Sequence, residues 1–139
     1  MSELRTNRIV PRDGLVSGAS GGVIQVVFSS LATGSTITVN SSSFVDIMSA
    51  SITPTRSDSK ILVQVTSSPK TNGSSSNFQF GAQIQRNSTT IMYDNEYLQM
   101  NNGYAPNAYT GAYTVLDSPA STSALTYKFR VKETVDGRE

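Results

Sequence analysis

Apolar and polar residues alternate along most of the chain from Val23 to Val131, which is the pattern of half-buried β-strands. The alternation is strictest in Phe78–Gln85 and Leu125–Lys132. Val23–Phe28 is apolar except at Gln25, which predicts a strand covered on both faces. Further strands are predicted at Thr36–Asn40, Phe44–Met48, Ile61–Val65, Thr89–Met100 and Ala108–Leu116.

The predicted strands number about eight and are separated by turns rich in Ser, Gly, Asn and Pro. One of them is ambiguous, because Ile91, Asn95 and Leu98 in Thr89–Met100 would also fit a helical turn. Short strands at this spacing are typical of an antiparallel β-sandwich or jelly roll. The pattern therefore predicts an all-β fold.

Residues 1–22 lack this alternation. They contain three arginines, a turn-like Pro11–Gly14 and a glycine- and serine-rich stretch, Ser17–Gly22. Ordering a residue costs roughly 1–2 kcal/mol, and a segment with few apolar side chains does not offset that cost. The sequence thus predicts an extended N-terminal arm and hinge, 1–22, which a partner holds in place, followed by a β-sandwich domain, 23–139.

Composition narrows the class of protein. A chain of 139 residues is long enough for one domain, and its apolar content of 37% and charged content of 15% are both low. Disulfides and thiolate metal sites are excluded because there is no Cys. Without an apolar run near ~20 residues or a signal-like start, we expect a soluble protein that is made in a cytoplasm and does not contact membrane. A net charge of +1 gives little drive to bind nucleic acid.

The residue types that enzymes use are sparse. Without His, a Ser/His/Asp relay and histidine zinc sites are excluded, and Ser17–Gly22 lacks the Gly-Lys-Ser/Thr ending of a phosphate loop. Asp94 and Glu96 lack the dense acidic spacing of a calcium loop. We therefore expect no catalytic residue, no metal and no cofactor. A glycoside hydrolase would need two carboxylates across a cleft, but we interpret the candidate carboxylates as surface acids. They are Asp46, Asp58, Asp94, Glu96 and Asp117.

Two groups of residues are candidate contacts. One predicted strand projects three cations from the same side: Lys128, Arg130 and Lys132. They form either a cationic stripe that binds a phosphate or an acidic partner surface, or a solvated outer face whose charges prevent pairing at a sheet edge. A set of tyrosines suits either a subunit or glycan contact, or core filling and trimer packing. Its members are Tyr93, Tyr97, Tyr104, Tyr109 and Tyr113.

Three segments carry a family resemblance: LRTNRIVPRDGLVSGASGGVIQVV, SSSFVDIMSASITPTRSDSKILVQV and SALTYKFRVKE. They resemble small β-sandwich proteins of marine tailed phages, especially cyanophages and pelagiphages. The resemblance covers most of the chain and implies a jelly roll of the tumour-necrosis-factor or C1q type, a homotrimer, and a place on the phage particle as a fibre, tail or capsid-surface component. It implies no catalytic residue.

The resemblance also implies an anchor within Leu4–Gly14 that contacts other phage structural proteins, in the capsid or tail. Relatives continue with a turn and a closing strand where this chain has Thr134–Glu139, so Leu125–Lys132 is expected at an open sheet edge that a neighbouring subunit completes. The implied anchoring residues are Leu4, Arg5, Arg8, Ile9, Val10, Pro11 and Arg12.

These expectations combine into one functional hypothesis. The chain is expected to be a non-enzymatic structural protein of the virion, made in the host bacterial cytoplasm, that decorates the particle surface as a cement protein. The alternative is a tail-fibre or receptor-binding head that binds host surface glycan. A third hypothesis is a glycan-cleaving enzyme.

Overall fold

The computed structural model describes residues 23–69, 77–101 and 110–135, and in these ranges the regular structure consists of strands alone. The expectation of an all-β chain is confirmed, and Thr89–Met100 is extended rather than helical. The described part holds six strands where about eight were predicted. They are β1 (Val45–Ile52), β2 (Ile61–Ser67), β3 (Asn77–Arg86), β4 (Thr89–Asn101), β5 (Gly111–Asp117) and β6 (Leu125–Val135).

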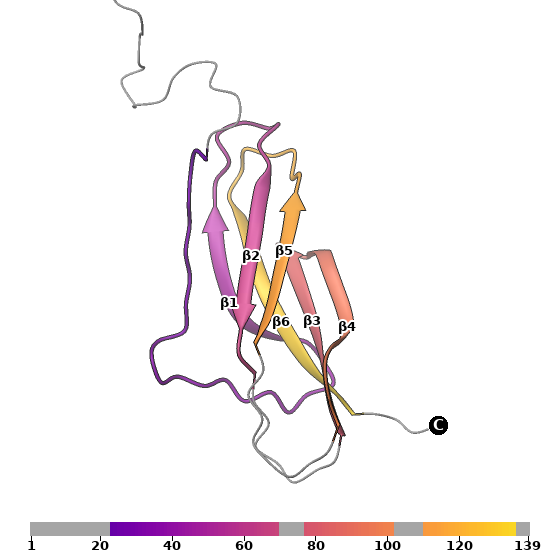
Figure 1. Ribbon diagram of the computed structural model, residues 1–139. Helices are drawn as coiled ribbons and strands as arrows, with labels where there is room; N and C mark the ends of the chain where they lie inside the picture. Colours follow the sequence, from indigo (N-terminus) through magenta and orange to yellow (C-terminus); the bar gives the residue numbers. More distant parts are fainter. Residues whose placement is uncertain (1–22, 70–76, 102–109, 136–139) are drawn as a thin grey trace, which may run out of the picture.

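The strands pair in a nested order, and every pair is antiparallel. β1 pairs with β6, β2 with β5, and β3 with β4, while β6 also pairs with β3. This gives a four-stranded sheet in the order β1-β6-β3-β4 and a two-stranded sheet of β2 and β5. Figure 1 shows the two-stranded sheet lying across one face of the larger sheet.

The core lies between the two sheets. Alternate residues of β3 and β6 point inward, and Ala82 and Ile84 are almost completely buried. The side chains of β2 and β5 that pack against them come from Val63, Val65, Tyr113 and Val115. The remaining buried members of this core cluster are Phe80, Phe129 and Val131.

β6 lies inside its sheet, which corrects one prediction. Leu125–Lys132 was expected at an open edge, but β6 is hydrogen-bonded to β1 on one side and to β3 on the other. Its register with β3 runs unbroken from Phe78↔Val135 to Arg86↔Tyr127. The charges on this strand therefore do not protect an edge. The order of strands depends on pairing between distant segments, which alternation within one strand does not encode.

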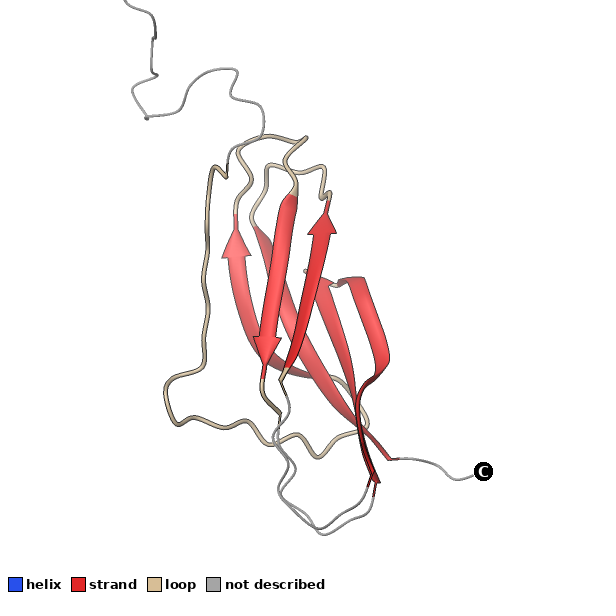
Figure 2. Cartoon of the chain, viewed as in Figure 1, coloured by secondary structure: helices blue, strands red, loops and turns tan. Residues whose placement is uncertain are grey.

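The two predicted strands nearest the arm are absent. Val23–Phe28 and Thr36–Asn40 form loop, and the first strand begins at Val45. Figure 2 shows this loop running beside the strands before β1 begins. Instead of being covered on both faces, Val23, Val26 and Phe28 are more than 80% exposed, at 83%, 81% and 84%. Alternation gives a segment the capacity to form a strand, but the strand also needs an edge to pair with.

Candidate functional site

The three cations of β6 lie together on the outer face of the four-stranded sheet. Burial alternates along the strand, so that Tyr127, Phe129 and Val131 are buried while the intervening residues are half-buried. This side is the one that faces away from β2 and β5. Lys128, Arg130 and Lys132 therefore belong to a surface rather than to the core.

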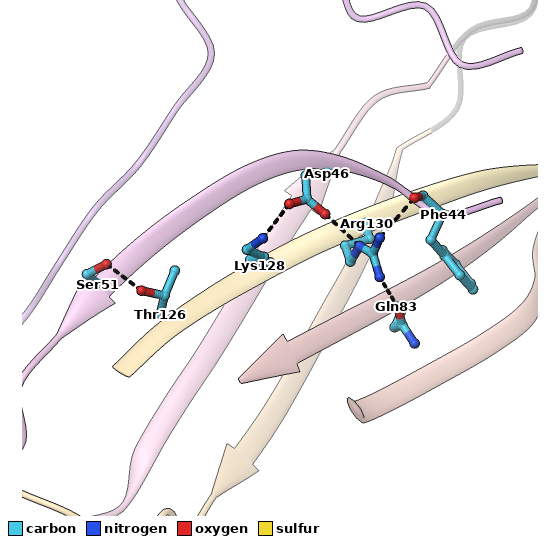
Figure 3. A network of polar contacts seen from close by, with 7 residues as sticks. All are labelled: Phe44, Asp46, Ser51, Gln83, Thr126, Lys128 and Arg130. Atoms are coloured by element: carbon cyan, nitrogen blue, oxygen red, sulfur yellow. Dashed lines mark hydrogen bonds and ion pairs between the residues drawn. The ribbon is translucent and has the colours of Figure 1, made fainter. Parts of the chain in front are cut away.

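Asp46 on β1 holds two of these cations, as Figure 3 shows. Lys128 Nζ donates to Asp46 Oδ2, and Arg130 Nε donates to Asp46 Oδ1, each at 2.6 Å. The hydrogen bond from Lys128, followed by that from Arg130, lowers the pKa of Asp46 below its ordinary value despite the opposing effect of burial. One carboxylate of the chain thus offsets part of the charge of the three-residue cationic stripe.

Arg130 also spans three neighbouring strands. Besides Asp46, its guanidinium donates to the Gln83 side-chain oxygen at 3.2 Å and to the Phe44 carbonyl at 2.9 Å (Figure 3). Gln83 is buried on β3, and its amide nitrogen donates to the Thr90 hydroxyl at 2.8 Å. Arg130 therefore joins β1, β6 and β3 on their outer face, and each of its three guanidinium nitrogens donates a hydrogen bond within the chain.

Lys132 has a different environment, formed by two aromatic rings. Its Nζ lies 5.2 Å from the centroid of Phe44 and 5.7 Å from that of Tyr93, and Phe44 and Tyr93 meet edge to face at 5.8 Å. A Cβ at Gly81 would stand 2.8 Å from Lys132 Cε, so the glycine leaves room for the lysine stem. Among the described residues, no carboxylate lies within ion-pair distance of Lys132. We call Phe44, Tyr93 and Lys132 the aromatic-cation cluster.

The predicted tyrosines do not share one surface. Tyr93 lies on the outer face and is 53% exposed. Tyr113 packs against the core, where its ring lies 6.4 Å from that of Phe129 and its hydroxyl donates to Asp94 Oδ2 at 2.9 Å. The side chains of Tyr97, Tyr104 and Tyr109 lie outside the residues that the structure describes. For Tyr113, core packing is therefore the observed role.

A polar clamp that the sequence did not reveal joins the two sheets. Arg86 Nη1 lies 2.8 Å from both carboxylate oxygens of Asp117, and the Tyr127 hydroxyl donates to Asp117 Oδ2 at 2.6 Å. Burial, and then the hydrogen bond to Asp117, raise the pKa of Tyr127 above its ordinary value. The three residues come from β3, β5 and β6, and neither their spacing nor their local context marks them in the sequence.

The described aspartates engage in internal contacts rather than facing one another across a cleft. Asp46 and Asp117 hold cations, Asp94 accepts from Tyr113, and exposed Asp58 pairs with Arg56 at 2.7 Å. Asp117 has a side chain only 10% exposed, so interpreting it as a solvated surface acid was wrong. Within 23–69, 77–101 and 110–135, no three acidic side chains gather as a metal site would require.

The two sheets are not sealed at the side where β1 and β2 lie. A groove of about 940 Å³ opens there, lined by Val23–Ser29, by Met48–Ala50 and Ile52 of β1 and by consecutive residues of β2, and Ile84 and Phe129 of the core also line it. Figure 1 shows the loop that follows residue 23 running beside β1. We call this feature the open edge.

The predicted anchor, Leu4 to Arg12, lies outside the described residues. No described segment forms a helix with the length and apolar character needed to cross a bilayer. Comparison with protein-family models, curated proteins and solved structures finds no match.

Proposed function

We propose that the chain is a structural subunit of a tailed-bacteriophage particle, a decoration protein that binds the particle surface through Leu4–Gly14. In this proposal the domain is a jelly roll of the tumour-necrosis-factor or C1q type and assembles as a homotrimer. The open edge carries the proposal, because a chain that acts alone gains nothing from leaving large apolar side chains beside an unsealed core. Neighbouring subunits provide the missing cover.

The nested strand order supports the jelly-roll assignment. Pairing of β1 with β6, β2 with β5, and β3 with β4 is what a long hairpin gives when it folds over on itself, and the β3–β6 pair then joins the two halves of the larger sheet. This arrangement leaves the outer faces of both sheets available for contacts with neighbouring subunits.

A non-enzymatic role is supported by the state of the ionisable groups. Catalytic carboxylates work when they face a cleft in which substrate can bind. The described aspartates instead hold cations or hydroxyls of their own chain, and the groove at the open edge is lined mainly by aliphatic residues.

A second candidate function is a receptor-binding head, and the aromatic-cation cluster favours it. Tyr93 is half exposed and Lys132 Nζ lies 5.7 Å from the centroid of its ring, which suits contact with an acidic host glycan. A host-polysaccharide pull-down distinguishes the two roles: saturable binding that is lost with Tyr93→Ala supports the head, and no binding supports decoration.

The decoration proposal is tested by locating labelled subunits on purified particles by electron microscopy. We expect the label on the capsid surface, and loss of the protein should lower the stability of the particle to heat or low salt. A label confined to fibre tips, with loss of host adsorption, would favour the receptor-binding head.

The anchor is tested by deleting residues 1–20. The variant should keep its β-sheet circular dichroism and fail to join particles, and a chain with the same twenty residues in scrambled order should also fail. Incorporation that survives the deletion would exclude this arm as the anchor.

A further inference from the structure

We propose that the aromatic-cation cluster is a binding subsite for one carboxylate-bearing sugar unit of an acidic polysaccharide. In this subsite the sugar ring stacks on Tyr93, and its carboxylate binds the ammonium of Lys132. The inference rests on the second candidate function, the receptor-binding head, and deepens it by naming the class of sugar and the role of each side chain. It does not depend on the place of the protein on the particle.

The register of the four-stranded sheet places the cluster. In the neighbouring rows of its outer face, Lys132 is the cross-strand partner of Gly81, and Tyr93 is the partner of Gln83. Because Gly81 has no side chain, the stem of Lys132 lies over it, and Lys132 Nζ reaches both aromatic rings. The row of Tyr93 continues across the sheet through Gln83, Arg130 and Asp46, each the partner of the next.

Lys132 differs from the other two cations of this face. Asp46 holds both Lys128 and Arg130. Lys132 Nζ instead lies 3.4 Å from the Tyr93 hydroxyl, so two of its three donors remain for a ligand. A lysine ammonium is a compact point charge that pairs with a single anionic group. Sugar acids carry one carboxylate on each unit, whereas heavily sulfated sugars carry several charges.

Tyr93 provides an aromatic surface beside this charge. Its ring is 53% exposed and meets Phe44 edge to face, with an angle of 71° between the ring planes. A tyrosine ring offers an apolar face to the C–H groups of a sugar and a hydroxyl to its polar groups. Lys132 Nζ lies 5.7 Å from the centroid of this ring, a separation that one sugar unit with its exocyclic carboxylate can span.

Phe44, the third member of the cluster, is fixed by backbone contacts with β6. Its carbonyl accepts a hydrogen bond from Arg130 Nη2 at 2.9 Å (Figure 3). Slightly earlier in the chain, the Ser41 carbonyl accepts from Glu133 N at 2.8 Å. These two bonds hold the segment before β1 against β6. The cluster is therefore formed before a ligand binds, which limits the entropy lost on binding.

The surroundings favour a glycan over a protein partner. A protein interface of standard size buries about 800 Å² on each partner, and charged residues are depleted at its centre. Here one exposed aromatic ring is surrounded by polar and charged side chains, those of Asp46, Gln83, Lys128 and Arg130. Single-stranded nucleic acid needs a strongly positive groove, which a chain with a net charge of +1 does not favour. A sugar needs only an apolar contact and a few placed polar groups.

The test measures binding of the full-length chain to three carboxylated polymers, polygalacturonate, alginate and polysialic acid, by biolayer interferometry. Each polymer is compared with its own methyl ester, which keeps the sugar chain and removes the charge. Lys132→Gln and Tyr93→Ala remove the two proposed contacts. Lys60→Gln is the matched control, because it removes the same charge from an exposed lysine that donates to Ser118 in the loop after β5.

Gly81→Ala tests the positioning of the lysine. A Cβ at this position would stand 2.8 Å from Lys132 Cε, so the stem must move and carry the ammonium away from the rings. Gly81 is not among the residues with positive φ, so its backbone conformation accepts alanine.

We expect wild type to bind at least one carboxylated polymer saturably, and the ester of that polymer about tenfold more weakly, because the hydrogen bond to a charged group is lost. Lys132→Gln should bind both forms alike. Tyr93→Ala should weaken binding of both forms about fivefold. Gly81→Ala should reduce the preference for the charged form, and Lys60→Gln should match wild type. Circular dichroism of each variant confirms that the sheets are intact.

Equal affinity of wild type for a polymer and its ester would overturn the subsite while leaving a glycan-binding role. A preference that survives Lys132→Gln would overturn it as well, and so would the absence of saturable binding to all three polymers. Tighter binding of dextran sulfate that Tyr93→Ala does not change would replace the subsite with attraction between opposite charges. The labelled-particle experiment tests the place of the protein on the particle independently of these results.

Discussion

The two sides of the sandwich are closed in different ways. On the side of β3 and β6, two long strands pair in unbroken register over the buried core, and the clamp of Arg86, Asp117 and Tyr127 fixes the second sheet above them. On the side of β1 and β2, a groove reaches the core and an apolar loop lies beside it. The first side is stabilised within the chain. The second, we propose, is completed by another copy, so stability and assembly are assigned to different regions of one small domain.

The largest expected effect is the difference in unfolding free energy between two phenylalanine-to-alanine variants. Phe129→Ala removes a ring that is 3% exposed in the core between the sheets and should cost about 3–5 kcal/mol of unfolding free energy. Phe28→Ala removes a ring that is 84% exposed at the open edge, and in solutions too dilute for association it should cost less than about 0.5 kcal/mol. Urea denaturation of both variants measures the difference. Equal losses would mean that the open edge is already closed within one chain.

The second effect tests the clamp. Asp117→Asn removes the negative charge from a largely buried pair and leaves Arg86 without its partner, so we expect a loss of about 1–3 kcal/mol. Asp58→Asn is the matched control, because it breaks the exposed pair with Arg56 and should leave the urea midpoint unchanged. If the two variants are equally stable, the clamp contributes no more than a surface ion pair.

The alternation of side chains predicts β3 and β6 well, because a strand with one buried face must repeat every two residues. It does not predict which strands become neighbours. Arg86 and Asp117 are 31 positions apart and lie on different sheets, so nothing local links them. Tyr93 and Tyr113 look equivalent in the sequence, yet one is on the surface and the other packs on the core.

Val23–Phe28 shows a further limit of the same pattern. Its apolar residues predict a buried strand, and within one chain that prediction is wrong. Burial of a strand requires a partner edge, and the chain's own edges do not take it up. In the assembly that we propose, a neighbouring copy supplies the cover that this segment lacks.

A third effect appears at alkaline pH. Folding raises the pKa of Tyr127, so the folded state holds the hydroxyl proton more tightly than the unfolded state does. The stabilisation that this group contributes is therefore fully present below the unfolded pKa of about 10 and declines as the pH rises above that pKa. The decline from this group is at most about 1.4 kcal/mol per pH unit. Tyr127→Phe should reduce the alkaline slope of the unfolding free energy relative to wild type. An unchanged slope would mean that the Tyr127 hydroxyl does not contribute to the clamp.

The smallest effect concerns Asp46 on the β1 edge. Folding lowers its pKa, so its pairing with Lys128 and Arg130 is present above the unfolded value of about 3.9 and is lost as the pH falls through the lower folded value. These side chains are partly exposed, and solvent screening limits the contribution to at most about 1 kcal/mol. Asp46→Asn should therefore be slightly destabilised near pH 6 and match wild type near pH 2. A difference that persists at the lower pH would contradict the pairing.

Association of the purified chain tests the central claim most directly. Sedimentation equilibrium over a range of concentrations should show wild type as a discrete oligomer, while Val26→Asp, which places a charge in the exposed apolar loop at the open edge, should sediment as a folded monomer. A wild-type chain that stays monomeric at every concentration, or a Val26→Asp variant that associates as wild type does, would contradict the account of the open edge.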